Sequence, residues 1–173
     1  MPITPLHLGL LAPLNHWLPG KVSNLSFWLV TLWLDAGAIA YYAFGLERGE
    51  LHGPETHSFI AAMALASVVA MAGFLYYVIK EVCRPVLHTN QERALAWLFG
   101  AYLGGFSHIL LDAMVHSEML PFHPLPGNPF YWGGMTWLSL LLVPPLLWLI
   151  VQYVSAGVRQ VQKSLAVLQG WRH

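Results

Sequence analysis

The chain has 173 residues, of which 57% are hydrophobic and only 9% are charged. A soluble domain usually carries about 25% charged residues, so this composition favours an integral membrane protein. Eight basic residues balance eight acidic ones, which leaves no net charge to attract nucleic acid. Cys83 is the only cysteine, and this excludes an intramolecular disulfide and a thiolate zinc cluster.

Four stretches are long and apolar enough to cross a bilayer, which takes about 20 residues. They run from about 25 to 46, 58 to 79, 94 to 115 and 135 to 157. The first contains Asp35, and the third contains His108 and Asp112. The fourth contains Pro144 and Pro145, which should kink it. We therefore expect an all-α bundle of four transmembrane helices.

The charges near the ends of these spans predict an orientation. Basic residues gather on one side of the predicted bundle: Lys21, Lys80, Arg84, Arg93, Arg159 and Lys163. By the positive-inside rule this side is cytoplasmic, both termini lie there, and the loops at 47–57 and 116–134 lie outside. Apolar and polar residues alternate after Gly157, which predicts a C-terminal amphipathic helix on the inner leaflet. We expect residues 1–173 to form a single domain.

Histidines and aspartates converge at the outer end of the predicted bundle. His57 precedes the second span, while His108 and Asp112 share a helix face near the end of the third. Asp35 stands near the middle of the first span, where an ionised carboxylate costs about 2.5 to 3.5 kcal/mol. Such a residue requires a partner, a cavity or a metal. Imidazole and carboxylate ligands together suit zinc, manganese or iron.

Considered one at a time, these residues leave other interpretations open. For His108 and Asp112 alone, a neutral hydrogen-bonded pair inside a bundle outweighs a metal site. For Asp35 alone, a helix-to-helix hydrogen bond or a proton relay weighs as much as metal ligation. His123 is assigned to an interfacial loop beside aromatic residues. The convergence of side chains from three helices is what favours a metal site, because facing helices are where such sites are built.

Short segments of the chain also carry a family resemblance. "TPLHLGLL" at 4–11 is similar to a "TH-x-x-x-G" segment, "HGPETHSF" at 52–59 to "HRG-x-THS", and "SHILLD" at 107–112 to "SHxLLD". In this order they resemble the membrane-bound metal-dependent hydrolases, the YdjM-like inner-membrane group. Gly53 replaces the arginine of that family, and "WLDAG" around Asp35 keeps one aspartate where two are common.

The resemblance implies a hydrolase of the bacterial inner membrane, distantly similar to zinc-dependent phospholipase C and P1-type nucleases. It implies a divalent metal, zinc above others, held by these ligands: His7, Asp35, His57, His108 and Asp112. His52 and His116 would be secondary ligands or would support the ligands. His7 reaches the site only if residues 3–18 form a short membrane-buried helix.

The predicted reaction is hydrolysis of a phosphoester or a lipid head group by a water molecule that the metal activates. Glu55, two residues before His57, is a candidate general base. The main alternative is a non-catalytic membrane protein whose buried His and Asp network serves helix packing, partner binding or proton movement. A haem protein comes third, because the sequence has no C-x-x-C-H attachment motif.

Overall fold

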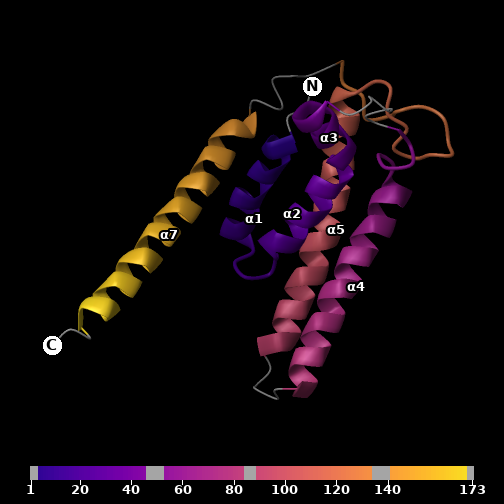
Figure 1. Ribbon diagram of the computed structural model, residues 1–173. Coiled ribbons are helices and arrows are strands. Elements are labelled where there is room, and N and C mark those ends of the chain that lie inside the picture. Colours follow the sequence, from indigo (N-terminus) through magenta and orange to yellow (C-terminus); the bar gives the residue numbers. More distant parts are fainter. Residues whose placement is uncertain (1–3, 46–52, 84–88, 134–140, 171–173) are drawn as a thin grey trace.

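The computed structural model describes residues 4–45, 53–83, 89–133 and 141–170 (Figure 1). All regular secondary structure in these ranges is helical, which confirms the all-α prediction for them. The elements are the 3-10 helix η1 (Thr4–Leu10) and the α-helices α1 (Leu11–Trp17), α2 (Asn24–Leu34), α3 (Ala36–Phe44), α4 (Phe59–Cys83), α5 (Thr89–Val115) and α7 (Val143–Gly170).

The helices α4 and α5 lie side by side and form the longest hairpin of the described chain (Figure 1). Within them, Phe59–Lys80 and Gln91–Val115 are long and apolar enough to cross a membrane, and they are the two such helices among the described residues. They correspond to the predicted second and third spans. Ala62, Ala66 and Ala70 are buried on one side of α4. Small residues of this kind let membrane helices approach closely.

The predicted first span is broken at Asp35. Helix α2 ends at Leu34 and α3 begins at Ala36, with Asp35 at φ −88° and ψ 7° between them. The two helices have 11 and 9 residues. At about 1.5 Å per residue, neither crosses a hydrocarbon core about 30 Å thick. The prediction of one continuous spanning helix over 25–46 is therefore wrong. An aspartate suits such a junction because its carboxylate competes for backbone groups inside a helix.

Helix α2 lies directly against α5, at positions where glycine lets the two backbones meet. A Cβ atom on Gly100 would lie 2.4 Å from the carbonyl oxygen of Ser23, and one on Gly104 would lie 2.9 Å from a carbonyl oxygen of α2. The N–H group of Ser23 donates a hydrogen bond of 2.8 Å to the carbonyl of Ala96. These contacts fix α2 along α5 and bring Asp35 level with the last turns of α5.

The N-terminal segment, η1 followed by α1, begins near the end of α5 and runs back along the bundle. His7 in η1 contacts Asp112 in the last turns of α5. Ser23, which follows α1, donates a hydrogen bond to Ala96 near the beginning of α5. The described chain therefore begins at the Asp112 end and finishes, with α7, far from it (Figure 1). This arrangement differs from the two termini on one side that four crossings would give.

Helix α7 packs against η1 and α1 through its first half. Pro144 and Pro145 stand in its first turn, where proline is tolerated because N–H groups there lack helical acceptors. Residues 135–140 of the predicted fourth span lie outside the described residues. A turn at Leu142 separates helical Leu141 from α7, so an interruption of the helix lies just before the two prolines. The residues after Gly157, predicted to form a separate amphipathic helix, continue α7 without a break. Leu149 is buried against η1 and α1, and the second half of α7 diverges from the other helices (Figure 1).

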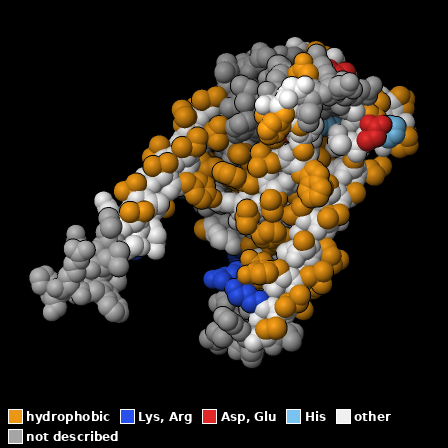
Figure 2. Space-filling model, in the orientation of Figure 1, with side chains coloured by type: hydrophobic (Ala, Val, Ile, Leu, Met, Phe, Trp, Pro, Cys, Tyr) orange, Lys and Arg blue, Asp and Glu red, His pale blue; other side chains and the backbone are white. Residues whose placement is uncertain are grey.

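Two apolar clusters hold the helices together. The first joins α2, α4 and α5 and includes Val30, Ala66 and Ile109. The second joins η1, α1, α2 and α7 and includes Leu11 and Phe27. Figure 2 shows further hydrophobic side chains along the outer surfaces of α4, α5 and α7. Because exposed apolar side chains cover these helices, their surfaces suit contact with lipid.

Candidate metal centre

Four of the five predicted ligands meet in one buried group. A ligand atom from each of Asp35, His57, His108 and Asp112 lies within 4.8 Å of the others. His108 and Asp112 are 0% exposed, His57 is 1% exposed and Asp35 is 6% exposed. The α2–α3 junction supplies Asp35, the turn before α4 supplies His57, and α5 supplies the other two. We call these residues the four-residue group, and it can hold a metal ion.

The distances within the four-residue group fit ligands around a shared ion. His108 Nε2 lies 3.4 Å from Asp35 Oδ1 and 3.3 Å from Asp112 Oδ2. His57 Nε2 lies 3.5 Å from Asp35 Oδ1 and 4.0 Å from Asp112 Oδ2. Good N–H···O hydrogen bonds measure about 2.7 to 3.2 Å. Ligands about 2.0 to 2.1 Å from a tetrahedral zinc ion lie about 3.3 to 3.4 Å apart, close to three of the four distances.

Several polar atoms of the four-residue group also lack ordinary hydrogen bonds. Among the described residues, Asp112 Oδ2 and both ring nitrogens of His108 are buried with no hydrogen-bond partner of good geometry, and Asp112 Oδ1 contacts His7 Nε2 over 3.1 Å. Leaving buried charge uncompensated costs several kcal/mol. A divalent cation would compensate the two carboxylates and use the imidazole lone pairs. The donor set and its burial therefore fit a divalent metal.

Helix α5 presents its two ligands together because they are four residues apart on one face. Ile109 and Ala113, which follow His108 and Asp112 directly, are 0% exposed and belong to the first apolar cluster. Their packing sets the rotation of α5. The core of the fold thereby directs the imidazole and the carboxylate toward Asp35.

His7 lies beside the four-residue group and contacts Asp112 through the other carboxylate oxygen. Its Nε2 atom is 3.1 Å from Asp112 Oδ1, and its ring centroid is 4.5 Å from that of His108. The set of mutually close donor atoms does not include it. The helical segment that brings His7 to the site, η1 and α1 over residues 4–17, is the one its participation was predicted to require.

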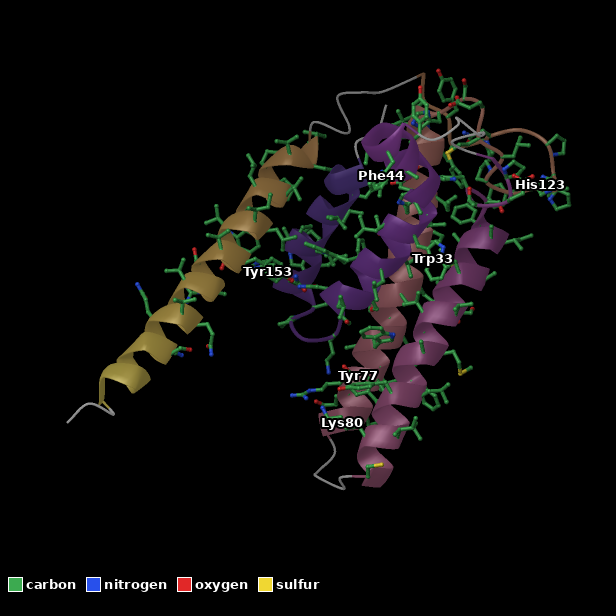
Figure 3. The ribbon with its side chains drawn as sticks, in the orientation of Figure 1. Trp33, Phe44, Tyr77, Lys80, His123 and Tyr153 are labelled. Carbon is green, nitrogen blue, oxygen red and sulfur yellow. The ribbon has the colours of Figure 1, made fainter. Side chains whose placement is uncertain are left out.

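The remaining candidates lie elsewhere or outside the described residues. His116 Nδ1 is 3.1 Å from Glu118 Oε1, just beyond the end of α5. Glu55 is exposed in the turn before His57. His52 falls outside the described residues. His123 is exposed in the loop that follows α5, as predicted (Figure 3).

Two side chains that the sequence did not single out support the site. The hydroxyl of Thr56 lies 2.8 Å from His57 Nδ1. The side-chain amide of Asn128 donates hydrogen bonds of 2.8 Å to the carbonyls of Ala113 and His116, and so caps the end of α5. The position of Thr56 beside a candidate ligand was a signal that could have revealed it. Asn128 had no such signal, because its partners are distant in the chain.

The fold and the site define an all-helical chain with two helices of membrane-spanning length and a buried His and Asp group that can hold a metal ion. Comparisons of the chain with models of protein families, with curated proteins and with solved structures found no match. The family resemblance of the short segments therefore stays a prediction.

Proposed function

We propose that the protein is a membrane-embedded hydrolase that depends on a divalent metal, zinc, bound by the four-residue group. The observation that carries this proposal is the burial of two imidazoles and two carboxylates at mutual distances that suit one ion. Nitrogen and oxygen donors of this kind suit zinc. Two carboxylates also balance the charge of a divalent ion, which favours its binding in a site with little water.

The chain's own residues have distinct roles in this proposal. His57 and His108 give ring nitrogens, and Asp35 and Asp112 give carboxylate oxygens. A zinc ion bound there would supply a Lewis acid, and it would lower the pKa of a water molecule toward about 7 where that water joins the four side chains as a fifth ligand. His7 contacts Asp112 Oδ1, whereas His108 contacts Oδ2, and in this proposal His7 holds that carboxylate in place. Glu55, exposed two residues before His57, is the candidate to accept a proton.

The proposed substrate is a phosphoester, with a lipid head group favoured. Support comes from exposed aromatic residues that neighbour the ligands in the chain. Trp33, two residues before Asp35, is 56% exposed, and Phe106, two residues before His108, is 48% exposed. Aromatic side chains gather where protein surfaces meet the membrane interface. A lipid held against these surfaces would have its head group near the site.

We place the protein in the bacterial inner membrane with the metal centre toward the outer face. Lys80 lies near the end of α4 far from the centre (Figure 3), and Arg93 lies near the matching end of α5. Lys21 precedes Ser23, which bonds to α5 near that end. Basic residues mark the cytoplasmic side. In this orientation α7 ends in the cytoplasm, whereas η1 begins on the outer side.

Metal content tests the proposal. The chain is purified in detergent and analysed by mass spectrometry for zinc, manganese and iron. We expect about one zinc per chain, and its loss from a variant with both His108→Ala and Asp112→Ala. Asp35→Asn, which removes one charge at nearly constant shape, should lower the zinc content. Glu118→Gln is the control, since Glu118 is exposed and outside the group. A folded wild type without metal contradicts the proposal, and a Soret band would point to haem.

One observation favours a second function, a metal or polar network without catalysis. The ligands are 0% to 6% exposed, so a substrate has little direct access to them. A network of this kind would serve helix packing, partner binding or proton movement. Vesicles of phosphatidylcholine and phosphatidylglycerol containing the protein separate the two functions. Hydrolysis of a head group that requires bound zinc supports the enzyme, whereas bound zinc without hydrolysis of any phosphoester supports the network.

A further inference from the structure

The turn before α4 holds His57 through both its backbone and its side chain. The carbonyl of Gly53 accepts hydrogen bonds from the N–H groups of Thr56, over 3.1 Å, and of His57, over 2.9 Å. The hydroxyl of Thr56 lies 2.8 Å from His57 Nδ1 and 3.4 Å from the same Gly53 carbonyl. The other ring nitrogen, His57 Nε2, lies in the four-residue group, 3.5 Å from Asp35 Oδ1. The turn therefore contacts one ring nitrogen and leaves the other to the group.

The hydrogen on this hydroxyl determines which nitrogen of His57 carries a hydrogen. The Gly53 carbonyl, 3.4 Å away, can only accept, so it offers the Thr56 hydroxyl hydrogen a longer contact than His57 Nδ1 does. When the hydroxyl donates to Gly53, its lone pairs face His57, and it accepts the hydrogen on Nδ1. A metal ion on Nε2 selects this arrangement, because a neutral ring that binds through Nε2 carries its hydrogen on Nδ1. A neutral imidazole with hydrogen on Nδ1 has a free lone pair on Nε2. This is the form that binds a metal ion through Nε2, and outer partners of ligating histidines commonly fix it in this way.

We propose that Thr56 is a positioning residue, which holds His57 with hydrogen on Nδ1 and directs the Nε2 lone pair toward the other three residues of the group. Thr56 itself is exposed, and it acts on the group through the His57 ring. The inference rests on the proposed metal binding, because only a bound cation makes the orientation of this lone pair important.

A pair of substitutions separates the hydroxyl from the shape of the side chain. Thr56→Val keeps the branched shape and removes the hydroxyl, whereas Thr56→Ser keeps the hydroxyl. The full chain in detergent is stripped of metal and titrated with zinc alone against a competing chelator. We expect the zinc Kd of Thr56→Val to rise about 10-fold to 100-fold, and that of Thr56→Ser to stay near wild type. The melting temperatures of the metal-free proteins should agree, because a general packing defect would lower that of Thr56→Val.

Nitrogen chemical shifts of histidine give a second measurement that does not depend on affinity. In metal-free protein with ¹⁵N-labelled histidine, we expect His57 to carry hydrogen on Nδ1 in wild type and in Thr56→Ser. Hydrogen on Nε2 in wild type would overturn the inference. So would a Thr56→Val variant that binds zinc as tightly as wild type, and this result would leave the proposed metal site standing. If wild type binds no zinc, the proposed function itself fails.

Discussion

At the scale of single residues, Asp112 serves neighbours on both sides of its carboxylate. Oδ2 lies 3.3 Å from His108 Nε2, and Oδ1 lies 3.1 Å from His7 Nε2. The two oxygens therefore have separate tasks, one toward the four-residue group and one toward His7. In metal sites, a partner on the outer oxygen of a carboxylate fixes its orientation. We infer that His7 acts through Asp112.

Substitutions at His7 and Asp112 should consequently differ in severity. His7→Ala leaves all four donors in place, so we expect zinc to remain bound with a Kd about 10-fold to 100-fold higher. Asp112→Asn removes a ligand charge, and we expect no zinc to survive purification. Mass spectrometry and chelator competition measure both effects. Complete loss of zinc from His7→Ala would show instead that His7 is a ligand, as the family resemblance implies.

The sequence could predict ligands where polar residues interrupt apolar helices. Asp35, His108 and Asp112 stand out because a polar side chain within a predicted span requires a partner. Thr56 and Asn128 do not stand out, because polar residues are common in turns and loops. The roles of these two depend on which atoms the folded chain brings beside them. Local patterns carry no information on that proximity.

At the scale of elements, the break between α2 and α3 is the feature that the hydropathy pattern concealed. Residues 25–46 are apolar on both sides of Asp35, and neither proline nor a cluster of turn residues marks the junction. The pattern therefore predicts one helix, whereas the structure has two. A broken helix is tolerated at membrane depth where protein surrounds the break. Here the break places the Asp35 carboxylate beside His57 and His108.

The contact between α2 and α5 gives a prediction about stability. Gly100→Ala would place a Cβ atom 2.4 Å from the carbonyl oxygen of Ser23, so the two helices must separate. We expect the free energy of unfolding to fall by about 1 to 3 kcal/mol, the usual cost of overpacking. Gly157→Ala in α7 is the control, since its Cβ would meet nothing within 4 Å. It should leave stability unchanged or raise it by about 0.5 to 1 kcal/mol.

Unfolding of the metal-free chain in mixed detergent micelles, followed by circular dichroism, measures both variants. The metal is omitted so that a change in zinc binding does not enter the comparison. Equal stability of Gly100→Ala and wild type would contradict the close packing of α2 on α5.

At the scale of the whole molecule, the N-terminal segment of η1 and α1 runs along the bundle, from the Asp112 end of α5 to the Ala96 end. The segment contains Pro5 and Pro13, and its apolar run is too short and interrupted to pass as a span. The sequence therefore predicts the helical class and the two long spans. It does not predict how far residues 4–17 extend along α5. That extent depends on packing against α2 and α7, which joins residues distant in the chain.

The proposed orientation predicts which surfaces face the cytoplasm. Cys83 is exposed at the end of α4 opposite the metal centre, and Leu125, in the loop after α5, is 65% exposed. A membrane-impermeant maleimide added to intact bacterial cells should leave Cys83 unlabelled. It should label Leu125→Cys made in a Cys83→Ser background, and both cysteines should react after lysis. Labelling of Cys83 alone in intact cells would mean the opposite orientation.

X-ray absorption at the zinc edge tests the central claim, that Asp35, His57, His108 and Asp112 jointly bind one metal ion. For wild-type protein with one zinc per chain, we predict nitrogen and oxygen ligands at about 2.0 to 2.1 Å. The outer-shell scattering should correspond to two imidazoles and should fall to one in His57→Ala that is reloaded with zinc. A spectrum without imidazole scattering, or one dominated by sulfur at about 2.3 Å, would contradict the account.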